Sequence, residues 1–204
     1  MHPNAAFRTL DPDLAAALVA EIGFATIFAT TPDGPRVAHA PVMLDGDNRL
    51  LFHISRGNAL TRHIDGATAL AVVNGPDGYV SPGWYDGANQ VPTWNYVAIE
   101  MEGTVTRLDR DALIDQVDRL SAHFEARVFP DAPWTRAKMD PAIFSRMIDA
   151  ISGFVLTVQA WRPTLKLSQN KPAAERARVI AGLQKNGQGA LAHLMAQLVQ
   201  GDGS

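Results

Sequence analysis

Cysteine is absent from this chain of 204 residues. Its absence excludes disulfide bonds, thiolate zinc sites, cysteine-ligated iron–sulfur clusters and cysteine nucleophiles. The chain also lacks any run close to the roughly 18 uninterrupted apolar residues of a membrane span. Its first residues lack the basic start and apolar run of a secretory signal. We therefore expect a cytoplasmic protein with no membrane partner.

An excess of charge of one sign is missing too. The chain has 18 Lys and Arg against 21 Asp and Glu, a net charge of -3. This balance gives no bulk attraction to nucleic acid, although a local basic patch stays open. Hydrophobic residues at 47% and charged residues at 19% are typical of a globular chain. We expect one domain over residues 1–204, with helical additions at about 109–150 and 170–200.

Several catalytic signatures are absent. The sequence has no nucleophile elbow, phosphate-binding loop, dinucleotide glycine fingerprint or HExxH helix. Its six histidines show no metal-ligand spacing, and we expect no metal site. His39 and His53 differ from the others because each lies inside an apolar strand, where a polar ring needs a partner.

The strand pattern begins with a hairpin whose turn at Thr31–Arg36 contains Pro-Asp-Gly. A second turn at Asp45–Asn48 leads to a strand that ends at Ser55. A later strand is expected to be interrupted at Gly75–Gly78. Alternating apolar and polar residues predict further strands at 96–105, 152–161 and, continuing extended after Pro163, 164–170.

Helix signals surround the strands. Asp11 and Asp109 are candidate caps, and a short helix is expected to end at Gly23. The helix after Asp109 has an apolar face made of Leu113, Val117, Leu120 and Phe124. Other helices are expected at Pro141–Ala150, near Asn170 and Pro172, and after Gly189.

The strands follow one another as hairpins, without the alternation of strand and helix that a parallel sheet requires. Six or more short antiparallel strands lose their exposed edges when they close into a barrel. We therefore predict a mainly β chain of the α+β kind, a β-barrel with flanking helices.

The stretch "HISRGNALTRH" offers a candidate anion site where a strand ends. Ser55, Arg56 and Asn58 bring a hydroxyl, a guanidinium and a helix-capping amide to one turn, a combination that favours a phosphate. The alternative is a strand that simply leaves through a polar turn into a capped helix.

Two further stretches carry grouped polar or aromatic residues. The segment "TLKLSQN" carries Lys166, Ser168, Gln169 and Asn170. These residues form either part of a ligand site or a solvated strand end with a helix cap. The cluster Trp94–Tyr96 stands where ordinary strand entries carry small turn residues. It either lines a cleft or packs at the rim of the barrel.

Several rare segments then point to one family. The segments are "YVSPGWY", "VPTWNYVAIEMEGTV", "ISGFVL" and "KLSQNKPAAERARVIAGL". Together, and in this order over nearly the whole chain, they resemble the signature segments of the PaiB-type family. That family consists of FMN-binding split-barrel proteins described as negative transcriptional regulators.

The resemblance implies a six-stranded split barrel similar to the pyridoxamine-phosphate oxidase group. It also implies a homodimer that binds FMN between its subunits. The phosphate would lie at Ser55, Arg56 and Asn58. His39 and Pro41 stand where the oxidase group has arginine and lysine on the preceding strand, so they would line the flavin ring and hold it less firmly.

The same resemblance implies that Trp94–Tyr96 shape a ligand cleft at the dimer seam. Lys166 and Gln169 would face the flavin held by the partner subunit, where a cation near N1 and the C2 carbonyl stabilises the reduced form. The complete set expected to bind the cofactor is His39, Pro41, His53, Ser55, Arg56, Asn58, Trp94, Asn95, Lys166, Gln169 and Asn170.

Three functions remain open at this point. The first is an FMN-binding negative regulator, which could contact DNA although the sequence shows no helix-turn-helix pattern. Its nearest basic face is Arg176, Arg178 and Lys185. The second is a flavin- or haem-dependent oxidoreductase in which His39 or His53 ligates a haem iron. The third is a dimeric flavin carrier without catalysis.

Overall fold

The computed structural model describes residues 4–8, 11–87 and 89–201. Its strands are β1 (Phe24–Thr31), β2 (Gly34–Leu44), β3 (Arg49–Ser55), β4 (Thr68–Val80), β5 (Thr93–Arg107) and β6 (Ile151–Lys166). Its α-helices are α1 (Pro12–Ile22), α2 (Arg110–Val128), α3 (Pro141–Asp149), α4 (Ala173–Lys185) and α5 (Gly189–Gly201). Short 3-10 turns are η1 (Ala5–Phe7), η2 (Ala59–Arg62), η3 (Pro82–Trp84) and η4 (Arg136–Lys138).

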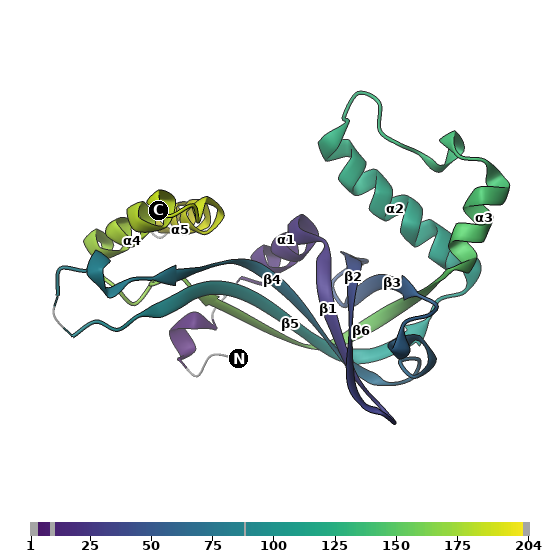
Figure 1. Ribbon diagram of the computed structural model, residues 1–204, viewed down its shortest axis with the longest axis horizontal. Helices are drawn as coiled ribbons and strands as arrows, with labels where there is room; N and C mark the ends of the chain where they lie inside the picture. Colours follow the sequence, from purple (N-terminus) through teal and green to yellow (C-terminus); the bar gives the residue numbers. More distant parts are fainter. Residues whose placement is uncertain (1–3, 9–10, 88, 202–204) are drawn as a thin grey trace. The chain divides into compact units, whose positions relative to one another are not determined.

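The strands close into a barrel in the order β1-β2-β3-β6-β5-β4 (Figure 1). Neighbours along the chain form the antiparallel β1–β2 and β2–β3 pairs, whereas β3 pairs with the distant β6. The predicted mainly β barrel with flanking helices is confirmed. Among the described residues, no helix is both long and apolar enough to cross a membrane.

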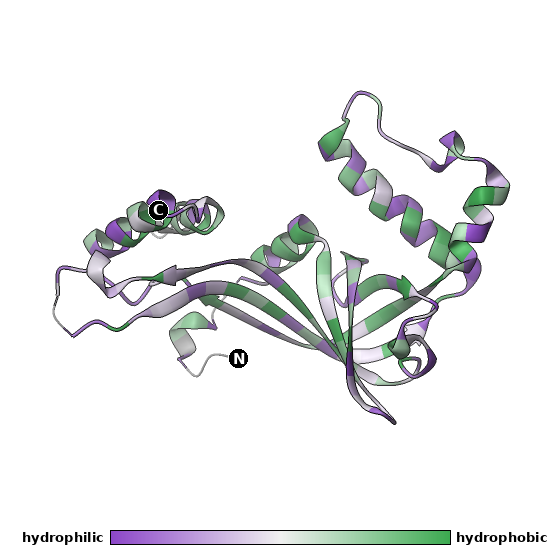
Figure 2. Ribbon diagram, in the orientation of Figure 1, coloured by the Kyte–Doolittle hydropathy of each residue, from purple (hydrophilic) through white to green (hydrophobic). Residues whose placement is uncertain are grey.

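The barrel core follows from the period of two in the strand sequences. Along β5 every second residue from Asn95 to Val105 is buried, and Figure 2 shows the matching alternation of apolar and polar residues. Inside the barrel the rings of Phe52 and Phe154 stack at 5.4 Å. Gly103 of β5 lies so close to β6 that a Cβ there would be 1.9 Å from the Thr157 carbonyl oxygen.

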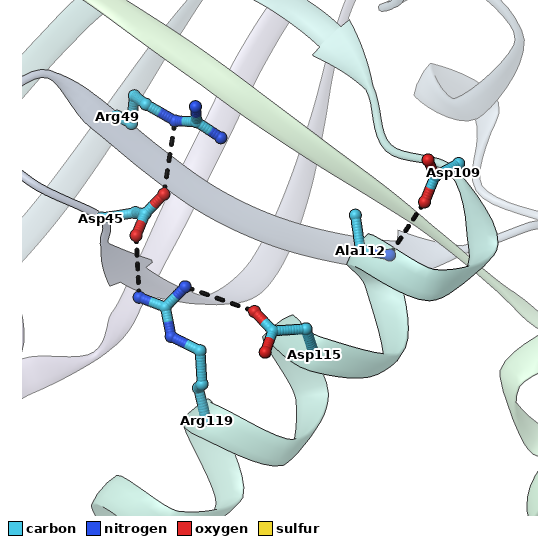
Figure 3. Close-up of polar contacts among 6 residues, drawn as sticks. All are labelled: Asp45, Arg49, Asp109, Ala112, Asp115 and Arg119. Carbon is cyan, nitrogen blue, oxygen red and sulfur yellow. Dashed lines mark hydrogen bonds and ion pairs between the residues drawn. The ribbon is translucent and has the colours of Figure 1, made fainter.

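Helix α2 begins where the sequence predicts, because the Asp109 side chain accepts a hydrogen bond from the Ala112 N–H at 2.8 Å (Figure 3). Arg119 of the same helix pairs with Asp45 at 2.9 Å and with Asp115 at 3.4 Å. These side chains are partly exposed, so the pairs orient the helix more than they stabilise it.

Two expectations about the strands were wrong. The first was the interruption at Gly75–Gly78, because β4 runs unbroken from Thr68 to Val80. It pairs with β1 only over Ala69–Val72. Pro76 lies beyond that segment, where the missing backbone N–H of proline breaks no hydrogen bond to β1. The second was the extended run after Lys166: β6 ends there, and Ser168 takes a left-handed backbone with φ of 59°.

The chain forms two compact units. The barrel unit lies within residues 16–73 and 100–161, and the C-terminal unit lies within residues 1–15, 74–99 and 162–204. The C-terminal unit contains α4, α5 and the outer segments of three barrel strands. The single-domain description stays a prediction.

Candidate functional site

The turn after β3 carries the predicted phosphate residues in the barrel unit. The Ser55 hydroxyl accepts a hydrogen bond from the Gly57 N–H at 3.3 Å. The Asn58 side chain accepts one from the Leu60 N–H at 2.9 Å, which caps η2. The predicted capping role of Asn58 is therefore confirmed. These local bonds fix the backbone of the turn. The side chain of Arg56, the first residue after β3, is exposed.

Arg56 lines a pocket of about 310 Å³ together with Arg107 and Ser152. The Arg56 guanidinium forms no hydrogen bond or ion pair with any residue that the structure describes. The Arg107 guanidinium donates to the Thr61 carbonyl oxygen at 2.7 Å and lies 4.8 Å from the centre of the Phe154 ring. Arg110 lines the same pocket, so three guanidinium groups meet there.

Two carboxylates line the same pocket. Asp149 pairs with Arg110, and Asp109 caps α2. No carboxylate of a described residue forms an ion pair with the guanidinium of Arg56 or Arg107. Three guanidinium groups and two carboxylates line the pocket, which leaves one net positive charge, and the Arg56 guanidinium has no described partner. Guanidinium donors in a positively charged pocket suit a phosphate.

The sequence did not indicate Arg107 or Ser152 as site residues. Arg107 ends β5, and Ser152 pairs with Ile54 at the beginning of β6. Neither lies in a local motif with Arg56. Their proximity follows from the strand order, because β6 lies between β3 and β5 in the barrel and brings these strand ends together.

His53 lies in β3 beside this turn. Pro41 and His53 each lie one residue beyond the last pair of β2 and β3, Val42 with Phe52. The Nδ1 atom of His53 is buried without a hydrogen-bond partner among the described residues. Burial lowers the pKa of His53 from its ordinary value. By contrast His39 is exposed, with Nδ1 3.2 Å from the Thr26 hydroxyl.

Acid should therefore weaken the fold through His53. Because its folded pKa is lowered, the unfolded chain binds a proton first as the pH falls below about 6.5, and stability drops from there down to the folded pKa. We expect His53→Gln to lose less stability than the wild type between pH 7.5 and 5. Urea titrations of the FMN-free protein at each pH measure this, and parallel pH curves for the two proteins would contradict it.

The second predicted group lies at the beginning of β5, in the C-terminal unit. Asn95 is only 1% exposed and points inward, where its Nδ2 donates to the Ser168 hydroxyl at 2.9 Å. Trp94 is 54% exposed and packs edge-on against Tyr79 at 6.2 Å between ring centroids. Neighbouring strand residues face opposite sides, so these two side chains do not line one surface.

The polar residues after β6 are also placed in the C-terminal unit. The Lys166 ammonium donates to the Trp94 carbonyl oxygen at 2.6 Å. The Gln169 amide is used within the chain, because its nitrogen donates to the carbonyl oxygens of Leu165 and Ala6 and its oxygen accepts from the Leu167 N–H. Asn170 is exposed and lines a pocket with Lys166. A flavin-binding role for this group stays a prediction.

Comparison with known proteins decides the family. The model of the family described as "Putative FMN-binding domain" matches residues 1–160. The chain belongs to this FMN-binding family. It is 30% identical over 186 residues to the protease synthase and sporulation protein PAI 2 of Bacillus subtilis (strain 168), covering 89% of this chain and 88% of that protein. The predicted PaiB-type membership is confirmed, and the chain carries an FMN-binding domain.

Two solved structures resemble this chain in fold. The flavocytochrome Anf3 of Azotobacter vinelandii has a TM-score of 0.63 at 13% identity, over 87% of this chain and 78% of that one. The FAD- and haem-binding protein of Mycobacterium smegmatis has a TM-score of 0.58 at 20% identity, over 83% and 78%. At such identities the likeness shows a shared split-barrel fold.

The residues of the barrel unit fit FMN. A flavin phosphate requires cationic N–H donors that are not already neutralised, and Arg56 and Arg107 supply them at one pocket. The flavin ring has polar edges, and the buried, unpartnered Nδ1 of His53 is a group that such an edge can satisfy.

Proposed function

We propose that this chain is an FMN-binding homodimer that acts as a negative transcriptional regulator of the PaiB type. The observation that carries the dimer is an exposed apolar face on the barrel unit.

The apolar face lies on three adjacent strands. Phe24 is 53% exposed, Phe28 is 40% exposed and Val37 is 45% exposed. Phe28 pairs with Val37 on β2 and with Leu70 on β4, and Phe24 pairs with Pro41. The polar pair Thr26 and His39 lies between these two apolar groups on the same face. Exposed aromatic and aliphatic side chains gathered on one face are typical of a protein–protein contact. A second copy of the barrel packed here would cover it.

The same face supports a shared flavin site. Strand β2 carries Val37, His39 and Pro41, and its other neighbour β3 carries His53 and leads into Arg56. A partner packed on β2 would exclude water from a flavin ring beside His39 and Pro41. Arg56 and Arg107 would hold the phosphate. Bound FMN supplies reversible one- and two-electron chemistry, and the chain's own residues bind and orient it.

Gene regulation rests on the likeness to the Bacillus protein, whose name connects it with protease synthesis and sporulation. The basic residues of α4 give limited support for direct DNA contact. Arg178 pairs with Asp86, and Arg176 donates to the Lys171 carbonyl oxygen. The third basic residue, Lys185, is exposed. Transcript profiles of a deletion strain carrying the wild-type or the Arg56→Ala gene test this part. Identical profiles for the deletion and the wild type would contradict it.

Phe28→Lys should convert the dimer to a monomer of 22.0 kDa, because it places a charge in the centre of the apolar face. FMN affinity should fall with it, since the site is proposed to be shared. Sedimentation and flavin absorbance measure the two effects. Val128→Lys is the matched control, because Val128 is 64% exposed at the end of α2, outside that face. A wild-type protein that sediments as a monomer at micromolar concentration would refute the dimer.

A second candidate is a flavin- or haem-dependent oxidoreductase. The observation that favours it is the unpartnered ring nitrogen of His53, since a neutral imidazole can ligate a haem iron. A visible spectrum of the purified protein distinguishes the haem-dependent form of this candidate from an FMN-binding protein, because flavin and haem absorb in different regions. A haem band that persists in His53→Gln would exclude His53 as its ligand.

A further inference from the structure

The C-terminal unit contains a pocket of about 260 Å³ that the proposed phosphate site does not use. It lies where the chain enters β5 and leaves β6. Its lining includes Lys166, Lys171, Tyr85, Asn95, Asn170 and Phe7. Two ammonium groups, an aromatic wall and amide groups therefore surround one small space.

Lys171 reaches this pocket from the segment before α4. Its ammonium donates to the Gln90 side-chain oxygen at 2.8 Å and lies 5.2 Å from the centre of the Tyr85 ring. Both partners are neutral, so the charge of Lys171 is not compensated by them. Asp86, the acidic residue next to Tyr85, pairs with Arg178 instead.

Lys166 is held more tightly at the end of β6. Its ammonium donates to the Thr93 hydroxyl and to the Trp94 carbonyl oxygen, again neutral groups. Burial lowers its pKa, which means that the protein around it stabilises the ammonium poorly. No described carboxylate forms an ion pair with Lys166 or Lys171. An anion in the pocket would supply the missing charge.

The inner wall is a buried polar pair. Asn95 is 1% exposed and Ser168 is 5% exposed, and they are hydrogen-bonded at 2.9 Å. Ser168 has a φ of 59°, a conformation that is uncommon for a residue other than glycine and that often marks a ligand site. The amide of Asn95 is therefore fixed in place.

We propose that this pocket binds a small aromatic carboxylate, a ligand separate from FMN, in place of the flavin-binding role that the sequence predicted for Asn95, Lys166 and Asn170. Its carboxylate would meet the ammonium groups of Lys166 and Lys171, and its planar ring would lie against Tyr85. The pocket is small, which suits a single-ring acid better than a nucleotide. This inference stands on the C-terminal unit alone and does not depend on the flavin site.

The probe is phthalate, with the matched neutral diamide of the same ring as its control, titrated by calorimetry into the full-length protein with FMN at saturation. We expect phthalate to bind and the diamide, which lacks both negative charges, to bind at least about tenfold more weakly, the factor that loss of a single charge-assisted contact already gives. Lys171→Met should weaken phthalate by a similar factor. Lys185→Met should bind it like the wild type, because Lys185 is exposed on α4 and does not line the pocket.

Three outcomes would overturn the proposal. The first is no phthalate binding at millimolar concentration, and the second is equal binding of the diamide. The third is phthalate binding only when FMN is left out of the titration, with Lys171→Met weakening both ligands, which would assign the pocket to the flavin. The affinity for FMN is measured separately in each variant, so a failure of flavin binding itself is distinguished from a failure of this pocket.

Discussion

Gly103→Ala should cost the protein about 3 kcal/mol of folding free energy, near the upper end for an added methyl group in a packed core. The added Cβ would lie 1.9 Å from the Thr157 carbonyl oxygen and 2.7 Å from its carbonyl carbon. Both atoms belong to the backbone of β6, so neither can turn away as a flexible side chain would. The two strands would have to separate, and urea titration should show a much lower midpoint.

Gly57→Ala is the matched control for this variant. Its φ is ordinary, and the nearest atom to an added Cβ is the Ser55 hydroxyl oxygen at 3.8 Å. We expect a change within about 0.5 kcal/mol, as at surface positions generally. If Gly103→Ala unfolded at the same urea concentration as Gly57→Ala, the close approach of β5 and β6 would be refuted.

Arg56→Ala should weaken FMN binding by about 10- to 150-fold, the equivalent of 1.5 to 3 kcal/mol for a charged hydrogen bond. The pocket would lose the guanidinium group that has no described partner, and Arg107 would remain to hold the phosphate. Riboflavin has no phosphate, so its affinity should change little. Fluorescence quenching of both flavins, titrated side by side, measures the difference.

Arg62→Ala is the control for charge alone. Arg62 is exposed on η2, a few residues from Arg56, and it does not line the pocket. Its removal lowers the net charge equally and should leave FMN binding nearly unchanged. If Arg56→Ala reduced the affinity for FMN and riboflavin by the same factor, Arg56 would have a structural role, and the turn would be only a capped strand end.

Much of the fold could be predicted because its signals are local. The alternation along β5, the turn at Asp45–Asn48 and the cap at Asp109 each depend on a few consecutive residues. Hydrogen bonds and burial at those positions act over short chain distances, so the sequence predicts them well. Where a local signal misled, as at Gly75–Gly78, pairing along the rest of β4 prevailed over the preference of glycine and proline for turns.

The sequence by itself determined the family, the barrel class, the helix caps and the polar turn that carries Arg56. Only the tertiary structure decided that Arg56 meets Arg107 at one pocket and that Asn95 turns inward while Trp94 faces solvent. It also decided that Lys166 and Lys171 share a pocket, where neither pairs with a carboxylate of the described residues. The physical reason is that these neighbours come from segments far apart in the chain. Their distances depend on strand order and on backbone turns such as Ser168, which no local pattern encodes.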